Sequence, residues 1–426
     1  RRLPLRRALD AALLRHPHRQ AMDDHDDTRP ATRLVALGRD ARAGFDFVNP
    51  PLVRGSTVLH ADVADMRSRV ARRNAGGDGE DGTPAAYGIY GTPTHLAFYK
   101  ALTALEGGHR SWAFPSGLTA CTMAILAHVQ QGDHVLIADS VYGPTRRFAR
   151  DTLPRYGVQA SFYDPRIGEQ GRAAVEALFH DNTRLLFLES PGSLTFEMQD
   201  VPLLAQVARS RGAVSVIDNT WATPLYFQPL AHGVDMSVHA ATKYIGGHSD
   251  LLMGTVTCNE RAWPRMRETI HHYGLTTSPD DCWLALRGLR SMGARLAQHR
   301  ATAEALIAWL KRQPEVERIL YPADPGDPGH RLWKRDMSGA SGLFGVVLQP
   351  GVAEARLHAL IDGMRLFGRG YSWGGFESLL IPAAPERTVT PYAYAGRLFR
   401  IAAGLEDPAD LLADLDAGFA RLRSAT

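Results

Sequence analysis

The sequence predicts an α/β protein with a mostly parallel central sheet, an N-terminal arm and a smaller α+β domain at the C-terminal end. From about residue 110 to 260, short strand-like runs alternate with helical patterns, and such alternation places crossover helices on both faces of a parallel sheet. Residues 294–311 then carry a long amphipathic helix pattern, and the tail mixes strand and helix patterns. We therefore expect an arm over residues 1–91, a large domain over 92–289 and a C-terminal domain over 290–426.

The expected elements follow one another regularly in the large domain. Strands are expected over residues 133–138, 159–164, 183–190, 213–218, 235–240 and 251–258, and helices over 144–156, 171–180 and 202–212. The C-terminal part has an expected strand over 342–349 and helices over 353–361 and 409–422. Sheets of this kind bind ligands at the carboxyl ends of their strands. We therefore searched the strand ends first for functional residues.

The N-terminal 91 residues show little periodicity. They include a Gly-rich, acidic stretch at 73–84, which is typical of a flexible arm or insertion. The first 20 residues are Arg-rich and lack the apolar core of a secretory signal, so we expect a loosely ordered extension, with a transit peptide as the alternative.

Composition excludes several classes of protein. The 426 residues are 45% hydrophobic and 22% charged, which indicates a globular chain rather than a disordered one. Lys and Arg total 48 against 45 Asp and Glu, a net charge of +3. Such a balance argues against a nucleic-acid-binding protein, which needs a basic face. The longest apolar runs are too short to span a membrane.

The cysteines and histidines give no sign of a metal site. Cys121, Cys258 and Cys282 are far apart and form no CxxC pair, which predicts buried free thiols in a reducing, cytoplasmic compartment. His248, the pair at 271–272 and the acidic run at 23–27 lack metal-ligand spacing. We therefore expect no bound metal.

Two charged residues lie at the ends of apolar strands. Lys243 follows the strand SVHA, and a Lys in such a position is costly unless its amine is neutral or covalently used. A desolvated amine suits Schiff-base chemistry with an aldehyde cofactor. Asp218 closes the strand AVSVI, where its carboxylate could pair with a protonated pyridine nitrogen. Taken alone, such a Lys would far more often be a surface residue, and an Asp that caps a helix or turn is at least as good a reading as a cofactor partner.

Two further signals come from glycine and tyrosine. Ser116-Gly117-Leu118 precedes a helical run, and a Gly there lets backbone N–H groups approach a phosphate. Helix capping alone would also explain that pattern. Tyr142 follows the strand HVLIAD, where an aromatic ring could stack on a cofactor or simply pack. Together, the phosphate loop, aromatic residue, Asp and Lys describe a pyridoxal-phosphate site.

At this point the chain resembles a known family, the Cys/Met-metabolism enzymes that depend on pyridoxal phosphate. The resemblance runs from about residue 32 to 422 and implies the three-layer fold type I of aspartate aminotransferase. Within the family it resembles the bacterial cystathionine β-lyase branch most. The supporting segments are YGIYGTPTH (87–95), LESPGS (188–193), IDNTWATPLYF (217–227), AATKYIGGHSD (240–250), KRDMSGASGLF (334–344), YSWGGFESL (371–379) and GLEDPADLLADLDAGFARL (404–422).

Three positions favour the β-lyase branch over its γ-lyase and γ-synthase relatives. Those relatives usually have Glu-Ser-Leu-Gly-Gly where this chain has Tyr371-Ser372-Trp373-Gly374-Gly375. They have Ser-Asn in place of Gly192-Ser193, and Ser in place of Ala241.

The resemblance implies a role for individual residues. Lys243 would hold the cofactor covalently and shuttle protons, Asp218 would pair with the pyridine nitrogen, and Tyr142 would stack on the ring and deprotonate the substrate amine. The backbone of Gly117 and Leu118, the hydroxyl of Thr242 and, from a neighbouring subunit, Tyr87 would hold the phosphate. Arg400 would bind the substrate carboxylate, for which a planar guanidinium is well suited. The substrate side would be lined by Tyr371, Ser372 and Trp373.

One position departs from the family pattern. The family usually reads Tyr-Gly-Arg where this chain has Tyr87-Gly88-Ile89. The missing Arg would neutralise the cofactor phosphate across a subunit interface. We therefore expect weaker anchoring of the cofactor, or a substitute cation that the sequence does not identify.

The resemblance implies a carbon–sulfur β-lyase of methionine metabolism and transsulfuration, acting on L-cystathionine or a related cysteine conjugate. Its α,β-elimination would yield homocysteine, pyruvate and ammonia. The family also implies a homotetramer of two active dimers. Three alternatives remain: a γ-lyase or γ-synthase reaction, a carbon–sulfur lyase of a secondary pathway, and a regulatory protein that binds pyridoxal phosphate with little turnover.

Overall fold

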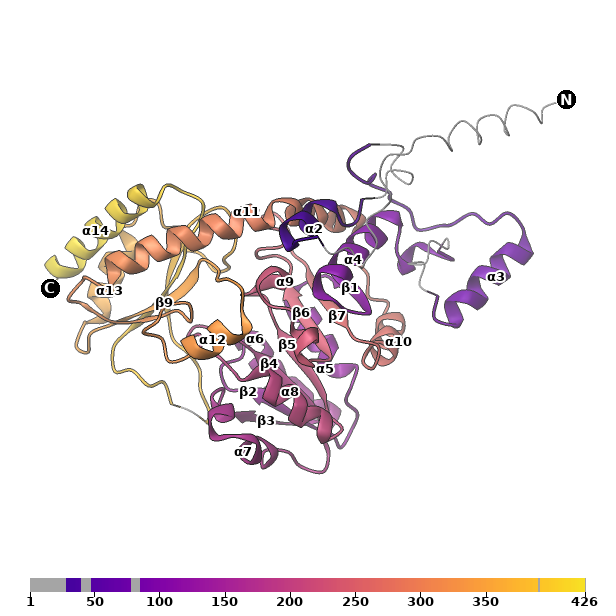
Figure 1. Cartoon of the computed structure of the whole chain (residues 1–426), viewed down its shortest axis with the longest axis horizontal. Coiled ribbons are helices and arrows are strands. Elements are labelled where there is room, and N and C mark those ends of the chain that lie inside the picture. Colours follow the sequence, from indigo (N-terminus) through magenta and orange to yellow (C-terminus); the bar gives the residue numbers. More distant parts are fainter. Residues whose placement is uncertain (1–27, 40–46, 78–84, 390, 426) are drawn as a thin grey trace.

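A computed structural model describes residues 28–39, 47–77, 85–389 and 391–425 (Figure 1). Its main feature is a seven-stranded sheet, which confirms the expected α/β class. The strands are β1 (Arg110–Phe114), β2 (His134–Ala138), β3 (Gln159–Tyr163), β4 (Thr183–Glu189), β5 (Val214–Asp218), β6 (Met236–Ala240) and β7 (Gly254–Cys258).

The strand order is β1-β7-β6-β5-β4-β2-β3. Strand β7 pairs antiparallel with both of its neighbours, and all other pairs are parallel. The sheet is therefore mostly parallel, as predicted. Asp218 is opposite Glu189 of β4 on one side and Val238 of β6 on the other. This register brings the carboxyl ends of β4, β5 and β6 together.

Helices cover both faces of the sheet, and two apolar clusters lie beneath them. One cluster joins the sheet to α4, α5, α10 and the first half of α11, and the other joins it to α8 and the C-terminal domain. The elements of the large domain are α4 (Pro93–Glu106), α5 (Gly117–Leu126), α6 (Gly143–Arg147), η2 (Phe148–Thr152), η3 (Leu153–Tyr156), η4 (Ile167–Gln170), α7 (Arg172–Glu176), α8 (Val201–Ser210), α9 (Thr223–Tyr226), η5 (Pro229–His232) and α10 (Trp263–Tyr273).

The C-terminal part is an antiparallel four-stranded sheet with helices against it. The strand order is β10-β11-β9-β8, and Figure 1 shows α11 running from the large domain along the C-terminal one. The elements are α11 (Pro279–Leu310), β8 (Val316–Leu320), α12 (His330–Asp336), β9 (Leu343–Leu348), α13 (Glu354–Asp362), β10 (Leu379–Ala383), β11 (Leu398–Ala402) and α14 (Pro408–Ser424).

Several elements differ from their sequence-based bounds. The helix expected over 294–311 already begins at Pro279, so the expected boundary at 289 falls inside α11. The helix expected over 144–156 is α6 followed by a π-helical turn, η2, and a 3₁₀ turn, η3. Charged residues in the first turn of α11 interrupt its apolar repeat, and Pro154 interrupts α-helical hydrogen bonding in the second segment.

Within the described residues before 91, the weak periodicity conceals short elements: α2 (Pro30–Ala36), α3 (Val63–Asn74) and η1 (Gly88–Tyr90). Leu34 and Leu37 of the α2 region are buried in the core, whereas α3 buries no residue. The expectations for residues 1–20, for the acidic run at 23–27 and for most of the Gly-rich stretch fall outside the described residues.

Predictions about the cysteines and about membrane-spanning segments also followed from the sequence. All three cysteines are buried and free, as predicted. Among the described helices, none is both long enough and apolar enough to cross a membrane.

Candidate active site

Lys243 lies in the turn that follows β6. Its backbone N–H bonds the Ala240 carbonyl at 3.0 Å, and the Gly247 N–H bonds the Lys243 carbonyl at 2.7 Å, so the turn is fixed on both sides. The Lys243 Nζ donates to the Ser372 hydroxyl at 2.5 Å and lies 5.4 Å from the centre of the Trp373 ring. Burial lowers the pKa of Lys243 to about 8, with a further lowering by Arg400 and an opposing rise from Asp218. The amine is thus partly neutral near physiological pH.

Arg400 lies on β11 and reaches the same serine from the other domain. Its Nη2 donates to the Ser372 carbonyl at 2.9 Å. Burial lowers the pKa of Arg400 to about 10, so it stays charged at neutral pH. Ser372 has a φ of +86°, which is uncommon for a residue other than glycine. Its strained backbone places the hydroxyl toward Lys243 and the carbonyl toward Arg400.

Asp218 stands at the end of β5, next to the strand that leads to Lys243. Its Oδ1 accepts the Thr220 N–H at 2.9 Å and the Thr220 hydroxyl at 2.5 Å. Its Oδ2 accepts the Cys121 thiol at 3.8 Å. These bonds fix the orientation of the carboxylate.

Tyr142 is fixed through its backbone, while its ring is 43% exposed. Its N–H donates to Glu189 Oε2 at 2.6 Å, which ties the end of β2 to the end of β4. Burial, and after it the charge of Asp218, raises the pKa of the Tyr142 hydroxyl. The same two causes raise the pKa of Glu189 well above its ordinary range. The Tyr142 hydroxyl therefore lies within electrostatic range of the Asp218 carboxylate.

The start of α5 approaches the turn of Lys243 closely. A Cβ added to Gly117 would meet the Cβ of Ala240 at 2.6 Å, so only glycine allows this contact. The Ser116 hydroxyl accepts the Thr119 N–H at 3.1 Å, while the first N–H groups of any α-helix point outward without an intrahelical acceptor. Thr242 is close by, but its hydroxyl bonds the Met253 backbone at 2.9 and 3.2 Å.

The structure brings most of the predicted residues together. Lys243, Ser372, Trp373 and Arg400 are in direct contact, and Asp218 and Tyr142 act on them electrostatically. Two predicted residues stand further out. Tyr371 is 91% exposed. Its link to the group is electrostatic: it slightly opposes the lowering of the Arg400 pKa by burial. Tyr87 is half-exposed in the segment before α4, where its carbonyl accepts the Tyr90 N–H.

Sequence reasoning missed the residues that hold this group in place. Thr220 and Glu189 lie within the supporting segments, but neither was singled out, because Glu189 bonds Tyr142, 47 residues away, and Thr220 bonds Ala240 as well as the nearby Asp218. A signal was available for Thr220, since a hydroxyl two residues after an Asp often folds back onto that carboxylate.

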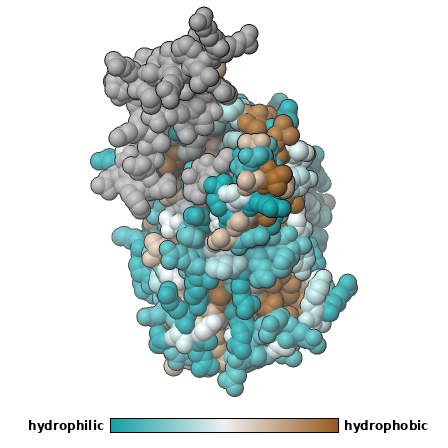
Figure 2. All heavy atoms as spheres, turned by 90° about the vertical axis from the view of Figure 1, so that its right-hand side faces the viewer, coloured by the Kyte–Doolittle hydropathy of each residue, from teal (hydrophilic) through white to brown (hydrophobic). Residues whose placement is uncertain are grey.

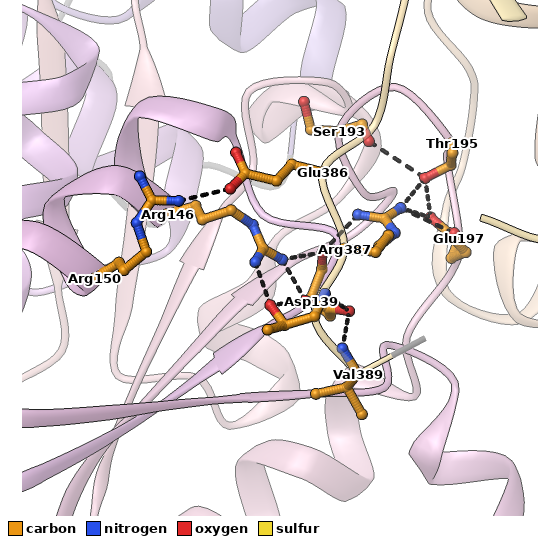
Figure 3. Close-up of polar contacts among 10 residues, drawn as sticks. Asp139, Arg146, Arg150, Ser193, Thr195, Glu197, Glu386, Arg387 and Val389 are labelled. Atoms are coloured by element: carbon orange, nitrogen blue, oxygen red, sulfur yellow. Dashed lines mark hydrogen bonds and ion pairs between the residues drawn. The ribbon is translucent and has the colours of Figure 1, made fainter. Parts of the chain in front are cut away.

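A second polar cluster was also missed; it is centred on Asp139, three residues before Tyr142 in the chain (Figure 3). The buried Asp139 carboxylate follows β2 and accepts the backbone N–H groups of Thr388 and Val389 at 2.8–3.0 Å, and it forms an ion pair with Arg146. Arg387 donates to the Asp139 carbonyl and pairs with Glu197 at 3.1 Å. The cluster fastens the segment that leads into β11 onto the loop of Tyr142.

The amino-acid sequence is similar to those of several known enzymes. The chain is 47% identical over 91% of its length to a putative cystathionine β-lyase of Rhizobium johnstonii, which is covered to 95%. It is 40% identical over 93% of its length to the cystathionine β-lyase MetC of Escherichia coli, covered to 99%. An L-alanine/L-glutamate racemase of Wolbachia pipientis is 39% identical, over 91% of this chain and 96% of its own.

The fold has a solved counterpart in the cystathionine γ-lyase of Lactobacillus plantarum complexed with L-serine. The TM-score is 0.80 at 28% identity, over 93% of this chain and all of that one. The predicted fold type I is thereby confirmed. Residues 31–420 match the family described as Cys/Met metabolism PLP-dependent enzyme. The chain therefore belongs to this family of pyridoxal-phosphate-dependent enzymes.

Proposed function

We propose that the protein is a carbon–sulfur β-lyase that cleaves L-cystathionine, or a related cysteine S-conjugate, to a thiol, pyruvate and ammonia. With cystathionine the thiol is homocysteine, a precursor of methionine. The observation that carries the proposal is the position of Lys243, between the Ser372 hydroxyl and the Trp373 ring. The names of two relatives, both cystathionine β-lyases, support the same reaction.

The residues present fit the family's cofactor. An amine with a pKa of about 8 suits attachment to an aldehyde, the Asp218 carboxylate suits a protonated ring nitrogen, and the outward N–H groups of Gly117 and Leu118 suit a phosphate. When bound, pyridoxal phosphate supplies an electron sink that stabilises negative charge at the substrate Cα. Thr242 and the partner subunit's Tyr87 would complete the phosphate site, and Thr242 would exchange its bond to the Met253 carbonyl for one to the phosphate.

The chain's own residues would divide the work as follows. Arg400 binds the substrate α-carboxylate, and the Tyr142 hydroxyl takes part in removing a proton from the substrate amine. Lys243 removes the Cα proton and returns a proton to the leaving sulfur, for which a pKa near neutrality is favourable. Ser372 accepts a hydrogen bond from the Lys243 amine and so directs it, while Trp373 and Tyr371 border the substrate side.

We further propose a cytoplasmic homotetramer of two active dimers. Three free buried thiols support a reducing compartment. Apolar side chains of the arm and of α3 are exposed, among them Phe47 (75%), Leu59 (88%) and Val63 (59%). Figure 2 views the molecule from the side of α3 and shows apolar residues gathered in patches there. Such patches are typical of interfaces between subunits.

Two related reactions compete with β-elimination. A γ-elimination or γ-replacement would yield 2-oxobutanoate or a new thioether, and a racemase reaction, as the Wolbachia relative's name suggests, would invert the Cα of alanine or glutamate. All of them begin with removal of the Cα proton, so Lys243 serves each. A lyase of a secondary pathway would differ only in its thiol product, and a regulatory protein would show no turnover.

The deciding experiment is a product panel on the purified holoenzyme. We expect L-cystathionine to give equal amounts of pyruvate and homocysteine, and Lys243→Ala to give neither. Lys100→Ala, on an exposed face of α4, is the matched control and should behave as the wild type. Formation of 2-oxobutanoate as the main product from L-cystathionine would overturn the proposal, as would conversion of L-alanine to D-alanine faster than pyruvate release from L-cystathionine, or pyruvate release by Lys243→Ala at the wild-type rate.

A further inference from the structure

Thr220 connects the two charged residues at the centre of the proposed site. Its hydroxyl donates to Asp218 Oδ1 at 2.5 Å and accepts the Ala240 N–H at 2.9 Å. Its own N–H donates to the same Oδ1 at 2.9 Å. The Thr220 side chain is more than nine-tenths buried, so water does not substitute readily for any of these bonds.

Through Ala240, Thr220 is also connected to the turn that carries Lys243. Ala240 receives the Thr220 bond at its N–H and uses its carbonyl to accept the Lys243 N–H at 3.0 Å. Ala240 also lies so close to Gly117 that a Cβ added to this glycine would be 2.6 Å from the Ala240 Cβ. A displacement of Thr220 would therefore be transmitted to both Asp218 and the backbone of Lys243.

The two oxygens of Asp218 are consequently not equivalent. Oδ1 accepts two strong donors from Thr220, whereas Oδ2 has the weak Cys121 thiol at 3.8 Å. Burial, and after it the charge of Asp218, raises the pKa of Cys121 well above its ordinary value, so this thiol stays protonated and remains a donor. Oδ2 is thus the oxygen with acceptor capacity left for a strong donor such as a protonated ring nitrogen.

We propose that Thr220 is a positioning residue that saturates Oδ1 of Asp218, presents Oδ2 to the ring nitrogen of pyridoxal phosphate and holds that carboxylate in register with Lys243. The inference rests on the proposed pairing of Asp218 with the cofactor. Thr220 itself would touch neither substrate nor cofactor, so its influence must pass through Asp218.

The first measurement is the dissociation constant of pyridoxal phosphate, obtained by titrating the apoprotein with the cofactor. Thr220→Val keeps the shape of the side chain but removes the hydroxyl, and we expect about tenfold weaker cofactor binding, because a hydrogen bond to a buried charge is lost. Thr220→Ser restores the donor and should stay within about threefold of the wild type. Thr302→Val, which removes a buried hydroxyl of α11 bonded to Gln298 at 3.2 Å, gives the baseline for such a loss.

The second measurement repeats Thr220→Val in an Asp218→Ala background. Because the proposed effect passes through the carboxylate, the substitution should then change the dissociation constant less than about twofold. An equal, tenfold effect in both backgrounds would show that Thr220 acts only through the backbone of Ala240 and would overturn the inference. Unchanged binding by Thr220→Val in the wild-type background would overturn it as well.

The two levels of the argument fail in different ways. If Asp218→Ala itself leaves cofactor binding and the absorbance of the bound cofactor unchanged, the pairing of Asp218 with the ring is wrong, and the role of Thr220 falls with it. If Asp218→Ala weakens binding but Thr220→Val does not, only the role of Thr220 is refuted.

Discussion

Arg387 donates a hydrogen bond to the Asp139 carbonyl at 2.5 Å, although 248 residues separate them. Asp139 is completely buried at the end of β2, and Arg387 belongs to the connection between β10 and β11. The two domains therefore meet three residues before Tyr142, and the same connection leads into the strand of Arg400. Figure 3 shows this junction, in which Arg387 and Val389 lie against Asp139.

Asp139→Ala should destabilise the protein strongly. The substitution would leave the buried Arg146 without its carboxylate and the N–H groups of Thr388 and Val389 without their acceptor. Breaking a buried pair from one side typically costs about 3–5 kcal/mol. Urea unfolding, followed by fluorescence, measures this loss.

Arg150→Ala is the matched control for this experiment, because Arg150 pairs with Glu386 at the exposed edge of the same cluster (Figure 3). The side chains of Arg150 and Glu386 are about half-exposed, and such a pair contributes at most about 1 kcal/mol to the free energy of unfolding. If the two variants lost equal stability, the buried cluster would not be what joins the domains.

The fold could be predicted from the sequence largely because its strands are short, apolar and regularly spaced. Buried strands such as HVLIA and TRLLFLE have no other plausible structure in an alternating pattern. The start of α11 at Pro279 was missed, because its first turns carry Asp280, Asp281 and Arg287 among the apolar residues.

The proposed site was predictable where one residue type performs the chemistry. Lys243 and Asp218 could be singled out because they follow or close apolar strands, whereas Arg400, in the middle of β11, was named only through the resemblance to the family. Glu189 and Arg387 were not predictable, because they acquire their roles only from partners that folding brings near, whereas Thr220 had a local signal in Asp218, two residues before it. Nothing in the local sequence of Arg387 indicates that it lies against Asp139.

The reaction of apoprotein with pyridoxal phosphate should accelerate as the pH rises through about 8. Only the neutral amine attacks an aldehyde, and the neutral fraction of Lys243 increases around its pKa of about 8 instead of 10.5. At pH 8 this makes the neutral form roughly 150-fold more abundant than in an ordinary lysine. Stopped-flow absorbance across pH 6–10 measures the midpoint, and a midpoint near 10 would contradict the burial of this amine.

Two substitutions should move that midpoint in opposite directions. Arg400→Gln removes a positive charge that lowers the pKa of Lys243, so the midpoint should rise. Asp218→Asn removes a negative charge that raises it, so the midpoint should fall. Burial is the largest cause and is unchanged in both variants, so neither midpoint should reach the value of an exposed lysine. Shifts of the same sign would contradict the proposed electrostatics.

Gly192→Ala should disturb the loop that carries Tyr142. An added Cβ at Gly192 would lie 2.4 Å from the Ser140 Cβ, and the Ser193 N–H bonds the Ser140 carbonyl at 2.7 Å. The neighbours must therefore move, at a cost of about 1–3 kcal/mol. We expect a lower melting temperature together with a lower kcat. Gly55→Ala is the control, because its added Cβ would meet nothing within 4 Å, and it should match the wild type in both respects.

Ser372→Gly should stabilise the chain and impair it as an enzyme. A φ of +86° is strained for serine but ordinary for glycine, so the substitution should raise the free energy of unfolding by about 1 kcal/mol. It also removes the hydroxyl that accepts the hydrogen bond from Lys243 Nζ, so kcat should fall several-fold.

Ser372→Ala loses the same hydroxyl but keeps the strain, and should therefore lower kcat without any gain in stability. Chemical unfolding and steady-state kinetics on the three proteins separate the two effects. Equal stability of the Gly and Ala variants would mean that the strain at this position is not real, whereas an unchanged kcat in both would mean that the hydroxyl does not direct the lysine.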